Sequence, residues 1–199
     1  MAKTIHIALV GNPNSGKSSL FNALTGMNQR VGNFPGVTVD KKMGSCSIAP
    51  GVEANIIDLP GTYSLYPRRE DEWVAYKVLM QQDKEVHPDM VVLVADASNL
   101  KRNLLFASQI IDLKIPVVIG LTMMDIARRK DIEIDVAELE RELGVPVIPI
   151  NPRKNKGIPR LKKTIEQTAR ELYKAPVRDF INNEALAPGA VKGVKSLLP

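Results

Sequence analysis

The sequence GNPNSGKSSLFNALTG, from Gly11 to Gly26, directly follows the apolar stretch IHIALV and restricts the chain to a narrow range of folds. Gly11-x-x-x-x-Gly16-Lys17-Ser18 fits the Walker A pattern in full. The glycines let backbone N–H groups converge on a phosphate, and the helix behind them directs the positive end of its dipole at the same charge. Lys17 is expected to reach the β- and γ-phosphates, and the Ser18 hydroxyl to ligate Mg²⁺. Strand, loop and helix occur in the required order, so the sequence predicts a nucleoside triphosphate site.

Apolar stretches typical of buried strands alternate along the chain with amphipathic stretches typical of helices. Six strands are predicted, at residues 5–10, 44–49, 52–59, 90–96, 115–122 and 145–150. Helices are predicted behind the glycine loop and at about 72–82, 99–113, 136–143 and 157–174, and residues 27–42 are predicted to form a loop. This alternation predicts a three-layer α/β domain with a mostly parallel, six-stranded sheet. Ligands of such sheets bind at the carboxyl ends of the strands. The loops after the strands are therefore expected on one face, behind Val10, Leu59, Ala95, Leu121 and Ile150.

Length and composition fit one globular domain with a short extension. The chain has 199 residues, of which 44% are hydrophobic and 25% charged, and these values are ordinary for a soluble globular protein. No stretch approaches the roughly 20 apolar residues that span a bilayer, and the N-terminal sequence does not resemble a signal peptide. A single cysteine, Cys46, fits a reducing, cytoplasmic compartment. The regular pattern ends near residue 173, so we predict one domain over residues 1–172 and a C-terminal appendage over 173–199.

Two further segments are candidates for the phosphate end of the site. Asp58 closes a predicted strand at the start of the sequence DLPG, where its carboxylate would hold Mg²⁺ through water and the Gly61 N–H would meet the γ-phosphate. Thr38, in GVTV, is a candidate Mg²⁺ ligand that is in place only when the γ-phosphate is bound. Ordering of such loops by the γ-phosphate is a known way of switching.

The order of these motifs resembles the translation-factor-like P-loop GTPases, which have a Ras-like fold. The segments NQRVGNFPGVTVDKK, DLPGTYSL and DASNLKRNLLFASQIIDLKIPVV, together with the Walker A segment, resemble the cytoplasmic G domain of the ferrous iron transport protein B family. In that family the G domain precedes a helical subdomain and a membrane permease. The resemblance implies a slow GTPase, stimulated by potassium, that regulates ferrous iron uptake at the cytoplasmic face of the bacterial inner membrane. Its implied partners are guanine nucleotide, the permease and a second G domain bound through the switch loops, which are the loops around Thr38 and Asp58–Gly61.

The resemblance also implies roles for individual residues. Asn14 stands where the family has its potassium ligand, although a simple loop-capping role remains an alternative. Thr62 occupies the position where many GTPases have a water-orienting glutamine, which favours slow hydrolysis. The implied catalytic set is Lys17, Thr38, Gly61 and Asn14, and the implied metal ligands are Ser18, Thr38 and Asp58 for Mg²⁺ and Asn14 for K⁺. The implied nucleotide-binding set is Gly11, Asn12, Pro13, Asn14, Ser15, Gly16, Lys17, Ser18, Ser19, Gly36, Val37, Thr38, Asp58, Leu59, Pro60, Gly61, Thr122, Met123, Asp125, Asn151, Pro152 and Arg153.

The residues expected to bind the base depart from the usual pattern. Base recognition in this class uses Asn-x-x-Asp, in which the carboxylate accepts hydrogen bonds from guanine N1 and N2. Here Asp125 is present, but Thr122 replaces the asparagine, and Asn151-Pro152-Arg153 replaces the usual small residues of the second base loop. We therefore expect weaker anchoring of guanine, with fast nucleotide release as a corollary.

Two other functions remain open at the level of the sequence. A basic segment made of Arg153, Lys154, Lys156, Arg160, Lys162 and Lys163 would serve a ribosome- or RNA-associated GTPase. Nucleic acid is disfavoured, because the net charge is only +5 and no aromatic side chains alternate with the basic ones, as in single-strand binders; a solvated helix face is the simpler interpretation. The other alternative is a nucleotide-binding switch with negligible hydrolysis or relaxed base specificity.

Overall fold

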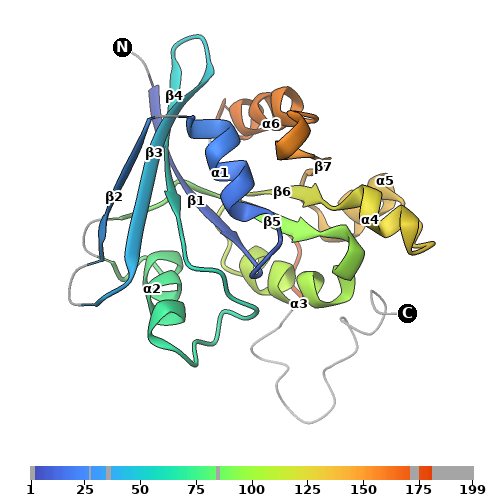
Figure 1. Cartoon of the computed structure of the whole chain (residues 1–199), viewed down its shortest axis with the longest axis horizontal. Helices are drawn as coiled ribbons and strands as arrows, with labels where there is room; N and C mark the ends of the chain where they lie inside the picture. The colour runs from blue at the N-terminus through green and yellow to red at the C-terminus, as the bar shows by residue number, and fades with distance from the viewer. Residues whose placement is uncertain (1–2, 27, 35–36, 84–85, 171–174, 181–199) are drawn as a thin grey trace.

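The computed structural model describes residues 3–26, 28–34, 37–83, 86–170 and 175–180 (Figure 1). Its strands are β1 (Lys3–Gly11), β2 (Gln29–Asn33), β3 (Asp40–Ala49), β4 (Val52–Asp58), β5 (Met90–Asp96), β6 (Val117–Thr122) and β7 (Val147–Pro149). Its helices are α1 (Lys17–Thr25), α2 (Glu70–Leu79), α3 (Leu100–Ile111), α4 (Met124–Arg129), α5 (Val136–Leu143) and α6 (Ile158–Arg170), with short 3₁₀ turns η1 (Ala97–Asn99) and η2 (Pro152–Lys154). No helix in these ranges combines the length and the apolar character needed to cross a membrane.

The described strands form one sheet in the order β2-β3-β4-β1-β5-β6-β7. The five strands from β4 to β7 are parallel to one another. The strand β3 runs in the opposite direction to the other described strands and pairs antiparallel with β4 and with β2. Because the parallel strands share one direction, the loops that leave their carboxyl ends lie along one edge of the sheet.

Helices cover both faces of the sheet, which confirms the predicted three layers (Figure 1). On β1, Ile7 and Leu9 pack into the core under α1 and α6, whereas Ala8 and Val10 pack into the core under α2, α3 and α5. Both faces of the central strands are therefore buried, and this explains why they are apolar without a polar alternation.

The sheet has one strand more than the six predicted. Residues 29–33, predicted as loop, form the edge strand β2, in which every residue is exposed. Because neither face of β2 is buried, its sequence shows no hydrophobic alternation, and the strand pairs antiparallel with β3 at the edge of the sheet. The prediction also missed the six-residue helix α4, which is too short for a recognisable period.

The described residues 175–180 lie against the main body of the domain. The Phe180 N–H donates to Asp112 at 2.8 Å, and its ring packs against the core of the α3 face. Lys114 pairs with Asp179 at 2.5 Å, and the Arg178 guanidinium donates to the Arg141 carbonyl at 3.1 Å. The predicted boundary between residues 172 and 173 lies outside the described residues and stays a prediction.

Candidate functional site

A cavity of about 820 Å³ lies along the carboxyl edge of the sheet. The glycine loop and the start of α1 contribute residues 12–14 and 16–19, and the segment from β4 to α2 contributes Gly61, Arg69 and Asp71. The β6–α4 segment contributes residues 122, 123, 125, 126 and 129, and the end of β7 with η2 contributes residues 150–153. The cavity thus extends from the β4 and β1 loops to the β6 and β7 loops, and these loops share one face as predicted.

The glycine loop is shaped by close backbone contacts and by two residues with positive φ. Gly16 has a φ of 91° and Asn14 a φ of 64°, and together they turn the chain from β1 into α1. A Cβ on Gly11 would lie 2.6 Å from the Val94 carbonyl oxygen, so a side chain does not fit there. Within the described structure, the side-chain oxygen and nitrogen of Asn12 and the Ser15 hydroxyl are buried and have no hydrogen-bond partner. Uncompensated buried polar atoms are rare and destabilising, and here they cluster in the loop that borders the cavity.

Lys17 and Asp58 form an ion pair at the floor of this end of the cavity. The Lys17 ammonium donates to the Asp58 carboxylate, and both side chains are largely buried. Lys17 comes from the first turn of α1 and Asp58 from the last residue of β4, which pairs with β1. The fold thus brings together the two residues assigned from the sequence to phosphate and to magnesium.

The loop from Gly61 to Leu65 is held against both the glycine loop and α3. A Cβ on Gly61 would lie 3.2 Å from the Pro13 nitrogen, and the Thr62 N–H donates to the Gly11 carbonyl at 3.2 Å. The Leu65 N–H donates to the Gln109 side-chain oxygen at 2.7 Å. The Thr62 hydroxyl donates to the Ser64 carbonyl at 2.7 Å, so this side chain is occupied within its own loop.

Thr122 lines the cavity at the end of β6 and supports the glycine loop through a hydrogen bond. Its buried hydroxyl lies 2.6 Å from the Ser15 carbonyl oxygen and 3.0 Å from that of Ala95, and donates its one hydrogen to either. Thr122 therefore connects the end of β6 with the glycine loop and with β5.

Asp125 lines the cavity from the first turn of α4, in contact with Arg129 one turn later. The Arg129 guanidinium donates to the Asp125 carboxylate at 3.0 Å. Desolvation is the largest single influence and raises the pKa of Asp125, but hydrogen bonds from backbone N–H groups and from Arg129, together with the charge of Arg129, outweigh it and hold the pKa below its usual value. A carboxylate that stays ionised is a good acceptor for N–H donors of a base.

The loop behind β7, which is expected from the sequence to contact the base, is ordered by its own backbone and by Asn151. The Asn151 side chain accepts from the Lys154 N–H at 3.2 Å, and its backbone pairs with Lys156. Pro152 opens η2 without an N–H, and the exposed Arg153 lies at the cavity wall.

Several residues assigned from the sequence do not line the cavity. Gly11, Ser15, Asp58 and Leu59 are buried and do not line it, and Pro60 is not among its lining residues either. Thr38 is exposed and away from the cavity, and Val37 packs against the core of the α2 face. Gly36 lies outside the described residues.

Five further residues line the cavity and were not predicted from the sequence: Arg69, Asp71, Ile126, Arg129 and Ile150. Arg129 was detectable in principle, because it lies four residues after Asp125 and such pairs meet on a helix. Arg69 and Asp71 were not detectable, because their place depends on the path of the loop before α2.

The residues at the phosphate end fit a magnesium–nucleotide complex. Ser18 and Asp58 supply oxygen donors of the kind that Mg²⁺ prefers, and Lys17 and the start of α1 supply positive charge for phosphate. Asn14 presents an amide oxygen of the kind that binds K⁺. The polar atoms of Asn12 and Ser15 that lack partners within the described chain add to this fit. No group of three or more His, Cys, Asp or Glu that could hold a metal ion is found among the described residues.

A mostly parallel sheet with a glycine loop between β1 and α1, and with aspartates behind β4 and β6, defines a P-loop domain of the GTPase fold class. A family model described as ferrous iron transport protein B matches residues 5–165, and the chain belongs to this family. The Fe(2+) transporter FeoB of Leptospira biflexa is 44% identical over 165 residues, which cover 83% of this chain and 23% of the relative. The chain thus spans about a quarter of the length of such relatives.

Solved structures agree with this assignment. The G domain of the T. maritima FeoB iron transporter is 41% identical, with a TM-score of 0.76, and the match covers 83% of this chain and 99% of that one. A mutant of S. thermophilus NFeoB bound to GDP is 40% identical, with a TM-score of 0.76, and the match covers 92% of this chain and 68% of that one. This chain therefore corresponds to the G domain of the family.

Proposed function

We propose that this chain binds GTP and GDP and hydrolyses GTP slowly, as the regulatory domain of a ferrous iron uptake system. The observation that carries the proposal is the cavity with Lys17, which is paired with the buried Asp58, at one end and Asp125 at the other. This polarity matches a nucleotide, which has phosphates at one end and a base at the other. The solved S. thermophilus relative with bound GDP supports guanine as the base.

At the phosphate end, Lys17 and the N–H groups of the glycine loop hold the β- and γ-phosphates. Bound Mg²⁺ would be held by Ser18 and Asp58, and would supply charge neutralisation on the β- and γ-phosphate oxygens. Thr38 would join this set by movement of its loop when the γ-phosphate is present, and the Gly61 N–H would donate to the same phosphate. These residues bind and orient the nucleotide before water attacks it.

Slow hydrolysis follows from the residue behind Gly61. Thr62 is buried and its hydroxyl is hydrogen-bonded to Ser64, so it does not orient an attacking water as a glutamine would. K⁺ held by Asn14 would supply positive charge near the bridging oxygen, where charge develops during bond cleavage. The Asn14 side chain is exposed at the cavity rim, which leaves its amide oxygen available.

The proposed setting is the cytoplasmic face of the bacterial inner membrane, where the domain acts on the permease portion of the transporter. Its basis is the full-length Fe(2+) transporter relatives, of which this chain matches a part. A further proposed partner is a second copy of this domain, bound through the switch loops.

Phosphate release from GTP and from ATP, in KCl and in NaCl of equal ionic strength, tests the proposal. We expect turnover of GTP over ATP and faster turnover in KCl. Asn14→Ala is expected to abolish the difference between the two salts while GDP still binds. Comparable ATP turnover would overturn the assignment of guanine, and equal rates in both salts would overturn the role of Asn14.

A further inference from the structure

An arginine at the start of α2 borders the cavity, although the sequence around it shows no recognised motif. Arg69 is the N-cap of α2 and contributes to the cavity wall together with Asp71. Its neighbour Arg68 is exposed and does not line the cavity. Two adjacent arginines of the same loop thus differ in their access to the site.

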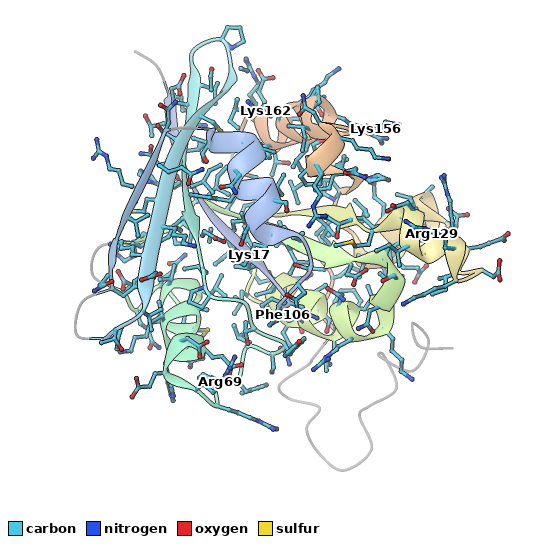
Figure 2. The ribbon with its side chains drawn as sticks, viewed as in Figure 1. Lys17, Arg69, Phe106, Arg129, Lys156 and Lys162 are labelled. Carbon is cyan, nitrogen blue, oxygen red and sulfur yellow. The ribbon has the colours of Figure 1, made fainter. Side chains whose placement is uncertain are left out.

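The order of the strands assigns Arg69 to the phosphate end. The base end is formed by the loops behind β6 and β7, and Arg69 belongs to the segment that leaves β4 on the other side of β1. In Figure 2, Arg69 lies beside α2 and Arg129 on α4, well apart in this view. Arg69 and Lys17 are therefore the two cationic side chains of the described cavity wall at its β4–β1 end.

The backbone of Arg69 is fixed, but its guanidinium is only loosely held. The Glu72 carboxylate accepts from the N–H groups of Arg68 at 2.8 Å and of Arg69 at 3.3 Å, which anchors the start of α2. The guanidinium lies 3.4 Å from Asp71 and 3.8 Å from Glu72, and 62% of the side chain is exposed. Exposed ion pairs of this kind contribute little to stability, so a phosphate with greater negative charge can take the guanidinium from them.

We propose that Arg69 acts within its own chain on the γ-phosphate, where its guanidinium donates hydrogen bonds to the phosphate oxygens as the bond to the β-phosphate breaks. The planar guanidinium fits two phosphate oxygens at once, and positive charge at this point stabilises the transition state. Arg69 forms and breaks no covalent bond and accepts no proton. The inference rests on the proposed GTP hydrolysis and adds a residue to it.

The test compares Arg69→Ala with Arg68→Ala and Arg69→Lys in the full chain. The measured quantities are kcat and KM for GTP, the affinity for GDP, and formation of the complex with GDP and aluminium fluoride, which mimics the transferred phosphoryl group. We expect Arg69→Ala to lower kcat about tenfold or more and to weaken the aluminium fluoride complex, with GDP affinity unchanged within about twofold. The kcat of Arg69→Lys is expected to remain well below that of the unaltered chain. The kcat of Arg68→Ala is expected to equal that of the unaltered chain.

The outcomes separate this inference from the proposed function. If the unaltered chain neither binds GDP nor releases phosphate from GTP, both fail. If it turns GTP over and Arg69→Ala has the same kcat and the same aluminium fluoride affinity as Arg68→Ala, only the assignment of Arg69 fails. A loss of GDP affinity in Arg69→Ala as large as the loss of kcat would also overturn it, because GDP lacks the γ-phosphate.

Discussion

Thr122 stands in the place of the usual asparagine and contacts the glycine loop through its hydroxyl. The sequence predicts weaker anchoring of the base because threonine lacks the amide of the usual asparagine. In the structure the Thr122 hydroxyl is turned away from solvent and donates to the Ser15 or the Ala95 carbonyl oxygen. It therefore secures the glycine loop whatever its effect on the base.

Thr122→Val tests this role, since valine keeps the shape of threonine and removes the hydroxyl. We expect the free energy of unfolding, measured by urea denaturation, to fall by about 1 kcal/mol, the usual net value of a buried hydrogen bond. GDP affinity should fall with it, because the glycine loop loses its support. Thr164→Val, on the surface of α6, is the matched control. Equal unfolding midpoints for Thr122→Val and the control would contradict this role.

Elements with a buried face were predictable from the sequence, and elements without one were not. β4, and α5 with its terminal Gly144, have bounds close to the predicted ones because apolar residues recur with the period of each element, whereas β3 begins at Asp40, four residues before its predicted start. The edge strand β2 buries no side chain, and the path from Gly61 to α2 depends on contacts with α3 that no local pattern encodes. The glycine loop of the site was predictable because a short sequence motif encodes it, and Arg69 was not, because its place depends on the path from Gly61 to α2.

The contacts of Gln109 make α3 a support for the loop behind β4. Its side-chain oxygen accepts from the Leu65 N–H at 2.7 Å and from the Ser64 hydroxyl at 3.3 Å. Gln109→Leu keeps much of the side-chain volume but leaves these donors without their acceptor. We expect faster amide hydrogen exchange over residues 62–66, with exchange in the sheet unchanged.

Hydrogen exchange measured by mass spectrometry checks this, and Gln167→Leu on the exposed face of α6 is the control. Unchanged protection of residues 62–66 in Gln109→Leu would show that the loop is held by other contacts.

At the scale of the whole molecule, the single cysteine reports on global unfolding. Cys46 is 7% exposed, and burial raises the pKa of its thiol although Lys162 acts in the opposite direction. Because the folded pKa is above the unfolded value, the contribution of the thiol to stability is present at neutral pH and is lost as pH rises into the alkaline range. Alkylation at pH 8 should therefore depend on unfolding, since the thiolate is the reactive form.

A nucleotide bound in the cavity would contact loops from both halves of the sheet, so we expect it to slow this alkylation. GDP at 100 times its dissociation constant would add about 2.7 kcal/mol to the free energy of unfolding, so we expect alkylation to slow about a hundredfold. ATP at the same concentration is the control. Alkylation at the same rate with and without GDP would show that Cys46 reacts through a local opening.

The ion pair between Lys17 and Asp58 makes the two halves of a magnesium–nucleotide complex thermodynamically dependent on each other. Phosphate alone would draw Lys17 away and leave a buried carboxylate facing negative charge, and a divalent cation alone would leave a buried ammonium beside a second positive charge. Either half-step leaves a buried charge without a partner, which is strongly unfavourable. When phosphate and the cation bind together, the single buried pair of Lys17 with Asp58 is replaced by two pairs, Lys17 with phosphate and Asp58 with the cation. Magnesium and nucleotide should therefore bind with positive cooperativity, and each should raise the affinity of the domain for the other by the same factor.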